Sequence, residues 1–100
     1  MTLANGYELT TTFWDDFSIA DRFGIKAVKD TFKRAFAEWK NDCVYLTELC
    51  IVMNLKCWQH YQKGNSQVSE LYSDYYYKVR DYALSHLKKD ELTFFFETTD

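Results

Sequence analysis

The stretch CVYLTELCIVMNLKCWQHYQK, residues 43–63, contains no glycine or proline and places three cysteines seven residues apart, at Cys43, Cys50 and Cys57. Seven residues of α-helix rise about 10.5 Å, whereas a disulfide bond needs Cα atoms within about 7 Å of each other. No two of these cysteines can therefore form a disulfide bond within one helix. The spacing instead predicts one long helix whose cysteines are small, packed side chains with reduced thiols.

The apolar residues of this stretch occupy two sides of the predicted helix. One stripe consists of Leu46, Leu49, Cys50, Met53, Cys57 and Tyr61. The other, separated from it by Asn54, consists of Val44, Ile51, Leu55 and Trp58. A helix that is apolar most of the way round is buried among other helices, so this one is predicted to be central. Lys56 falls outside both stripes and is predicted to lie on the polar, solvent-exposed side.

Further helices are predicted on both sides of the central one. Apolar residues at intervals of three and four predict helices over residues 13–22, 25–41 and 67–87, and Asp90 can cap a last short helix. The segments are separated by helix-ending residues, namely Gly24, Asn41-Asp42 and Lys63-Gly64-Asn65. The sequence therefore predicts an all-α fold in a single domain over residues 1–100, a compact bundle of four main helices plus a short C-terminal helix.

Residues 1–10 carry a turn signal of their own. Asn5-Gly6 is the preferred dipeptide of a type I′ turn, with Leu3 before it and Tyr7 and Leu9 after it. A lone two-stranded hairpin is marginal in water, so a small N-terminal β-hairpin would have to lie on the helices. A frayed terminus is the alternative that the pattern leaves open.

The composition narrows the class of protein. Of the 100 residues, 47% are hydrophobic, too many for a disordered chain, and three glycines without proline cannot supply the turns of a β-sandwich. The net charge of −3 predicts no general attraction to nucleic acid or to an anionic membrane. A run of about 18 apolar residues, which a membrane-spanning helix needs, is absent. An odd number of cysteines at helical spacing, without disulfide spacing, predicts a reducing compartment.

The residue types that carry out catalysis or bind metals do not form a recognisable catalytic or metal-binding motif in this sequence. Cys57 and His60 lie three residues apart on one predicted helix, but a zinc site needs about four ligands. The carboxylate pairs Asp15-Asp16 and Asp90-Glu91 lie at predicted helix starts, where acidic residues stabilise the helix dipole. The sequence therefore predicts no catalytic residue, no metal site and no cofactor.

Residues 13–40 support an alternative function, DNA binding. Ala20, Gly24 and Ile25 are spaced as in the core of a helix-turn-helix, although Asp30 stands where that motif has a buried aliphatic residue. Four lysines fall within about 60° of one another on the predicted second helix, namely Lys26, Lys29, Lys33 and Lys40. A recognition helix uses such donors for phosphates and base edges. The other interpretation, which the charge balance favours, is a solvated lysine face.

The helix predicted over residues 67–87 is rich in tyrosine. Its inward stripe includes Tyr72, Tyr75 and Tyr82. A second group is expected to point outward and consists of Tyr76, Tyr77, Arg80 and Leu84. Tyrosine and arginine are enriched at protein interfaces. This outward group is therefore the candidate protein-contact surface, either for another protein or for a second copy in a homodimer.

Four runs of the sequence carry a resemblance to known proteins: FWDDFSIADRFG (13–24), DTFKRAFAEWK (30–40), YLTEL (45–49) and ELTFFFETTD (91–100). They resemble small uncharacterised proteins encoded on bacterial plasmids, integrative conjugative elements and phages. The resemblance implies a cytoplasmic protein of a mobile element and supplies no catalytic residue. Together with the tyrosine surface, it predicts a non-enzymatic helical module that binds a partner protein or itself.

Overall fold

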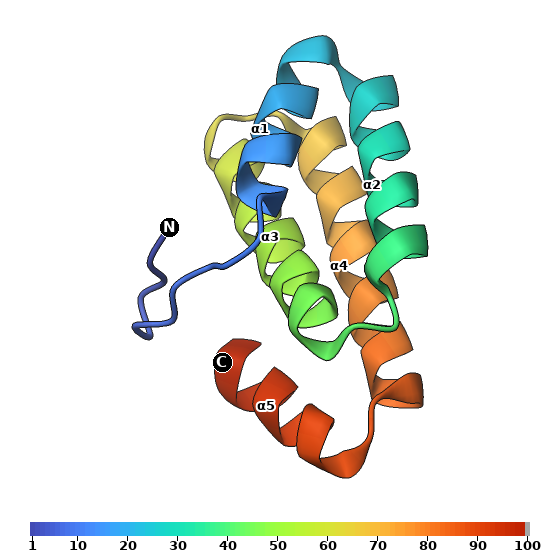
Figure 1. Ribbon diagram of the computed structural model, residues 1–100. Coiled ribbons are helices and arrows are strands. Elements are labelled where there is room, and N and C mark those ends of the chain that lie inside the picture. Colours follow the sequence, from blue (N-terminus) through green and yellow to red (C-terminus); the bar gives the residue numbers. More distant parts are fainter. Residues whose placement is uncertain (100) are drawn as a thin grey trace.

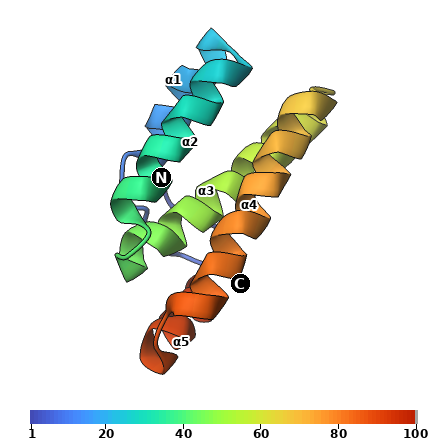
Figure 2. The ribbon, with the colours of Figure 1, turned by 90° about the vertical axis from the view of Figure 1, so that its right-hand side faces the viewer.

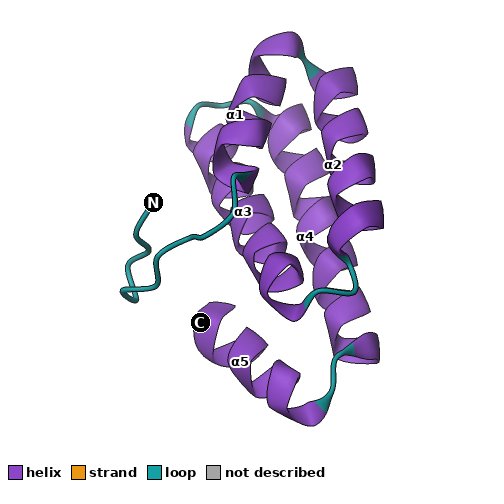
Figure 3. Cartoon of the chain, in the orientation of Figure 1, coloured by secondary structure: helices purple, strands orange, loops and turns teal. Residues whose placement is uncertain are grey.

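The computed structural model describes residues 1–99, in which the chain forms five α-helices (Figures 1 and 3). Their bounds are α1 Phe13–Phe23, α2 Ile25–Trp39, α3 Cys43–Gln62, α4 Ser66–His86 and α5 Lys89–Thr99. The predicted all-α fold is confirmed. The description as four main helices and one short helix needs correction, because α1 and α5 have the same length of 11 residues. No helix within residues 1–99 is both long and apolar enough to cross a membrane.

The helix α3 lies at the centre of the bundle, as predicted, but its two apolar stripes are not covered along their whole length. Val44 near its start and Trp58 and Tyr61 near its end are exposed. This helix packs against α1, α2, α4 and α5, and it forms an antiparallel pair with α4 (Figures 1 and 2). The hairpin of α1 and α2 covers one side of this pair, and α5 packs on α3. The arrangement also makes α2 and α4 neighbours, and a groove opens between them.

The ends of two helices follow from residue chemistry. Gly24 has a φ angle of 105°, a conformation that residues with a Cβ atom rarely adopt. The helix α1 therefore ends at Phe23, one residue beyond the predicted 13–22, with Gly24 as its C-cap, and α2 begins at Ile25. At the start of α3, the side chain of Asp42 accepts a 3.0 Å hydrogen bond from the backbone N–H of Tyr45. Of the two predicted capping residues, Asn41 and Asp42, the second is therefore the N-cap.

The predicted N-terminal β-hairpin is wrong. Within residues 1–99 the segment forms one isolated antiparallel bridge, between Thr2 and Glu8, and no strand. Residues 1–9 do fold back on themselves, since the backbone N–H of Leu3 donates to Tyr7 O at 2.8 Å and that of Leu9 donates to Met1 O at 2.9 Å. The pairing stops there, because the next two N–H groups, those of Thr10 and Thr11, donate to the side chain of Glu48 on α3. A two-stranded ribbon is marginal alone, and these contacts hold the segment without it.

The three cysteines are free thiols, and Cys50 is buried in the core. Burial raises the pKa of the Cys50 thiol to about 12, and a thiol reacts as the thiolate. In a Cys43→Ser/Cys57→Ser variant, we expect a thiol-specific dye to label Cys50 about 100-fold or more slowly in the native than in the urea-unfolded protein. A variant that keeps only the half-buried Cys57 is the control, and equal rates for Cys50 in both states would contradict its burial.

Candidate functional site

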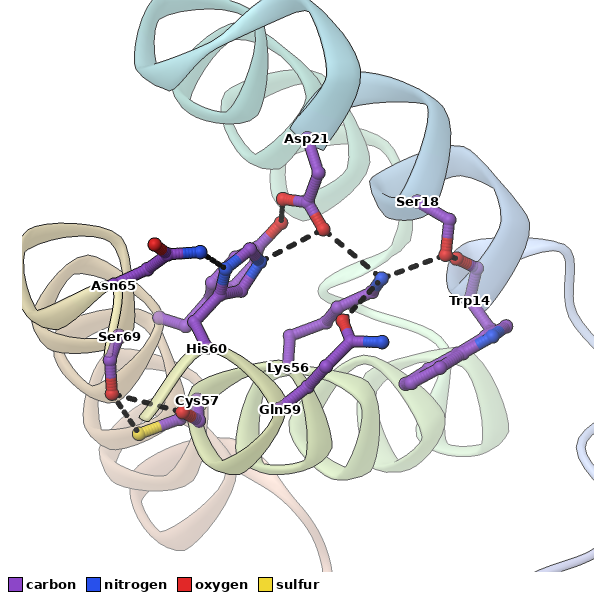
Figure 4. Close-up of polar contacts among 10 residues, drawn as sticks. Trp14, Ser18, Asp21, Lys56, Cys57, Gln59, His60, Asn65 and Ser69 are labelled. Carbon is purple, nitrogen blue, oxygen red and sulfur yellow. Dashed lines mark hydrogen bonds and ion pairs between the residues drawn. The ribbon is translucent and has the colours of Figure 1, made fainter. Parts of the chain in front are cut away.

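A buried polar cluster links α1 to α3 (Figure 4). Lys56 on α3 is only 1% exposed. Its ammonium group donates to three oxygen atoms, Ser18 Oγ at 2.7 Å, Asp21 Oδ2 at 3.1 Å and Gln59 Oε1 at 3.1 Å. The same nitrogen lies 4.3 Å from the ring centroid of Trp14. The prediction of a solvent-exposed Lys56 is therefore wrong, because α1 covers this side of α3 and supplies the lysine with an ion pair.

Asp21 is the centre of the cluster. Its Oδ1 accepts a 2.6 Å hydrogen bond from the hydroxyl group of Tyr72 on α4. Burial, together with this hydrogen bond and the charge of Asp21, raises the pKa of Tyr72. Asp21 Oδ2 also lies 3.0 Å from His60 Nε2, although the two atoms lack the alignment of a hydrogen bond. One carboxylate of α1 thus joins side chains of both α3 and α4.

The contacts of this cluster are those of a structural link. The three N–H donors of Lys56 each have an acceptor. Cys57 does not share a site with His60, because its Sγ lies 3.5 Å from Ser69 Oγ while the imidazole ring stacks on Tyr72. Within residues 1–99, no three His, Cys, Asp or Glu side chains are grouped so that they could hold a metal ion. The cluster therefore fixes α1 against the pair of α3 and α4.

A second buried carboxylate, Glu48 on α3, holds the N-terminal segment. It accepts hydrogen bonds from the backbone N–H groups of Thr10 and Thr11, at 2.8 and 2.9 Å, and from the hydroxyl groups of Thr10 and Tyr7, at 2.6 and 2.8 Å. Burial alone would raise the pKa of Glu48, but these hydrogen bonds outweigh it and lower the pKa. Burial and the hydrogen bond to Glu48 raise the pKa of Tyr7 to about 12.

A groove of about 410 Å³ runs between α2 and α4. Four lysines line it, namely Lys29, Lys33 and Lys40 from α2 and Lys78 from α4. None of the described residues that line this groove is acidic. The structure thus brings together three of the four lysines that were predicted as candidate nucleic-acid contacts. The fourth, Lys26, lies outside the groove and forms a 2.9 Å ion pair with Asp30.

The floor of the groove is a stack of aromatic rings that joins α2 to α4. Phe32 lies face to face with Tyr75 of α4, with 3.8 Å between the ring centroids and an interplanar angle of 5°. Within α2, Phe32 stacks on Phe36 with 5.5 Å between the ring centroids. Phe36 in turn meets the ring of Tyr82 of α4 edge-on, with 5.3 Å between the centroids. Such ring pairs contribute about 0.5–1.5 kcal/mol each beyond their buried area. The floor is therefore a preformed apolar surface.

Two of the groove lysines extend over these rings. Lys78 Nζ lies 5.5 Å from the centroid of Phe36, and Lys40 Nζ lies 5.8 Å from the centroid of Tyr82. A cation this close to a ring is attracted by about 0.5–1 kcal/mol at an exposed site. The ion pairs found among residues 1–99 involve none of the four groove lysines. The groove therefore combines an apolar floor with positive charges that can still accept carboxylate partners.

The Lys29 end of the groove is less positive than the other end. Lys29 also lines a neighbouring hollow with Glu70 and Asp74 of α4. Burial, followed by the charges of Asp30 and Asp74, raises the pKa of Tyr75 at this end. The positive charge is thus concentrated toward the C-terminal half of α2.

The predicted protein-contact surface is divided in the structure. Tyr77 and Leu84 point outward and are 55% and 40% exposed. Tyr76 is partly buried against the core and lines a separate hollow beside the N-terminal segment. Arg80 is half-buried, and its charge acts on Cys50 in the core. Of the four predicted residues, Tyr77 and Leu84 therefore form the outward part.

One residue of the groove was missed by the sequence reasoning although a signal for it exists. Lys78 lies three residues after Tyr75 and four before Tyr82, so it shares a helix face with both tyrosines. That spacing was sufficient to place Lys78 beside the aromatic floor. Lys56 and Glu48 have no comparable signal, because their partners come from other segments of the chain.

Comparison with known proteins assigns no family to this fold and groove. No protein-family model matches the chain, and no curated protein or solved structure is significantly similar to it. A function for this chain therefore has to be inferred from the residues of the groove.

Proposed function

We propose that this chain is a non-enzymatic protein-interaction module whose α2–α4 groove binds an acidic, amphipathic segment of a partner protein. The observation that carries the proposal is the set of four lysines around a preformed aromatic floor. An acidic segment can place carboxylates against the ammonium groups, in hydrogen bonds about twice as strong as those between neutral groups. Its apolar side chains can pack on the rings, as in other cases of helix-in-groove recognition.

A nucleic acid is the alternative polyanion, and the floor of the groove argues against it. Proteins bind single strands by stacking bases on free aromatic faces. Phe32 is buried and already stacks on Phe36 and Tyr75, and Tyr82 stacks on His86 at 3.9 Å. A recognition helix has to enter the major groove of a duplex, whereas the lysines of α2 line a hollow shared with α4. DNA is therefore the second candidate.

We expect a fluorescein-labelled amphipathic peptide of about four helical turns, with glutamates on one side and leucines on the other, to bind this protein. The variant Lys33→Ala/Lys40→Ala should bind it about five- to thirtyfold more weakly, because each lost charge contact contributes roughly 0.5–1 kcal/mol. Added salt should weaken binding to the native protein, since charges are screened over about 8 Å at physiological ionic strength. A titration followed by fluorescence anisotropy measures these effects.

The control variant is Lys63→Ala/Lys88→Ala, which removes two exposed lysines outside the groove. It should bind the peptide as the unmodified chain does, and an equal loss in both variants would contradict the groove. The same peptide with lysine in place of glutamate should not bind. A short DNA duplex measured in the same assay tests the alternative. If the duplex binds with sub-micromolar affinity and the acidic peptide does not, DNA binding replaces protein binding as the function.

The proposed setting of this module is the cytoplasm of a bacterium that carries a mobile element. The support for the mobile element is the resemblance of residues 13–24 and 91–100 to proteins of plasmids, conjugative elements and phages. The support for the cytoplasm is the presence of three free thiols, which fit a reducing compartment.

A further inference from the structure

A solvent-exposed side of α4 carries an acidic stripe with apolar anchors, and the N-terminal end of this stripe borders the hollow beside Lys29. The stripe consists of Glu70, Asp74, Tyr77, Asp81 and Leu84, all of which are exposed. Residues at positions i, i+4, i+7, i+11 and i+14 share one face of a helix. The acidic stripe thus has the chemistry of the segment that the groove is proposed to bind.

The spacing of the acidic stripe matches the spacing of the groove. On α2, lysines lie at positions 29, 33 and 40, and on α4, carboxylates lie at positions 70, 74 and 81. Both sets follow the intervals i, i+4 and i+11, so each spans about 16 Å of helix. The same register sets Tyr77 opposite Phe36 of the groove floor, because each lies seven residues after the first charged residue of its set.

The lysines of α2 and the carboxylates of α4 also lie at the same height along the helix axes. The helices α2 and α4 run in the same direction (Figure 1). Lys29 shares a hollow with Glu70 near one end, and Lys40 lies over Tyr82, the residue after Asp81, near the other. A two-fold axis parallel to these helices does not change the level of any residue. It therefore brings the lysines of one copy level with the carboxylates of the other.

We infer that the partner of the groove is a second copy of this chain, whose acidic stripe lies in the α2–α4 groove of a two-fold dimer. The inference rests on the proposed function of the groove and names its occupant. Each copy supplies one groove and one stripe, so a single two-fold axis pairs both at once. Tyr77 and Leu84, the outward part of the predicted contact surface, are the apolar anchors of this interface.

Charge reversal tests the pairing directly. One variant, Asp74→Lys/Asp81→Lys, reverses the stripe, and a second, Lys33→Glu/Lys40→Glu, reverses the groove. We expect light scattering to show a dimer of the 12.0 kDa chain for the unmodified protein, and half that mass for each variant alone. An equimolar mixture of the two variants should regain the mass of the dimer, because opposite charges then meet in both interfaces. The control is Glu38→Lys/Glu97→Lys, which makes the same change of net charge as the stripe variant at exposed residues outside both surfaces and should remain dimeric.

Several outcomes would overturn the inference. If the unmodified protein is monomeric at concentrations that saturate binding of the acidic peptide, a second copy is not the partner of the groove. The peptide titration then still decides whether the groove binds an acidic segment of another protein. Reversed variants that stay dimeric, or a mixture that stays monomeric, would place the dimer interface elsewhere. If circular dichroism shows that a reversed variant is unfolded, Asp74→Asn/Asp81→Asn makes the same test. Its dissociation constant for the dimer should be about tenfold or more higher than that of the unmodified protein, and an unchanged constant would contradict the pairing.

Discussion

Replacing Lys56 by alanine is expected to lower the free energy of unfolding by about 3–5 kcal/mol, the range typical of a buried ion pair that loses one partner. The substitution leaves the carboxylate of Asp21, only 14% exposed, without its ammonium partner. It also removes the donor to Ser18 and the cation over the ring of Trp14. Urea denaturation followed by circular dichroism measures the loss as a shift of the midpoint.

Two comparisons show whether the ion pair causes this effect. The double variant Lys56→Met/Asp21→Asn removes both charges and keeps the side-chain volumes, and it should recover much of the stability, because such replacements are often close to neutral. Lys63→Ala, at an exposed lysine shortly after α3, should stay within about 0.5 kcal/mol of the unmodified protein. If Lys56→Ala costs no more than Lys63→Ala, the ammonium group is solvated and the cluster does not link α1 to α3.

The helices could be predicted from the sequence because their signals are local. Gly24 ends a helix through its own φ angle, and Asp42 caps one through a bond to a residue three positions on. The central place of α3 was predicted from its two apolar stripes, and the middle of the helix is buried as expected. Val44, Trp58 and Tyr61 of these stripes are nevertheless 38%, 56% and 67% exposed, because periodicity does not show how far along the helix its neighbours reach. The N-terminal segment does fold back at its turn signal, which is local. The hairpin prediction failed because contacts with α3, which periodicity does not show, take the N–H groups that follow.

The groove could be predicted in part. The lysines of α2 share a face by their spacing alone, but one helix does not show which other helix lies beside that face. The stacking of Phe32 on Tyr75 supplies this information in the structure, and it brings Lys78 to the same groove. The matching intervals of lysines 29, 33 and 40 and carboxylates 70, 74 and 81 were present in the sequence. These intervals indicate a pairing only once α2 and α4 are known to run side by side in the same direction.

Lys56 shows why the rest could not be predicted. Helical periodicity states which residues share a face but not what covers that face, and a lysine is normally solvated. Here the covering helix α1 presents Ser18 and Asp21 among its apolar residues, so two polar positions from different helices satisfy each other. Glu48 is a similar case, because its partners are backbone groups of a segment without regular structure.

Glu48→Ala is expected to lower the free energy of unfolding by about 3 kcal/mol at neutral pH, the lower end of the range expected for Lys56→Ala. A hydrogen bond to a charged group contributes about 1.5–3 kcal/mol, and the backbone N–H groups of Thr10 and Thr11 both lose such an acceptor. Water replaces part of the loss, since Thr10 lies at the surface. Denaturant midpoints measure the effect, and Glu97→Ala, at an exposed carboxylate of α5, should stay within about 0.5 kcal/mol.

The same carboxylate should make the stability of the protein depend on pH. The pKa of Glu48 is lowered in the folded protein, below its unfolded value of about 4.3, so the unfolded chain binds the proton more tightly. The stabilisation by Glu48 is therefore complete above about pH 5 and is lost as the pH falls through the folded pKa. Glu48→Gln, which has no carboxylate to protonate at this position, should be less stable than the unmodified protein at neutral pH and should lose less stability on acidification. Denaturant midpoints at a series of pH values compare the two proteins, and equal losses in both would show that the ionised carboxylate of Glu48 does not hold the N-terminal segment on α3.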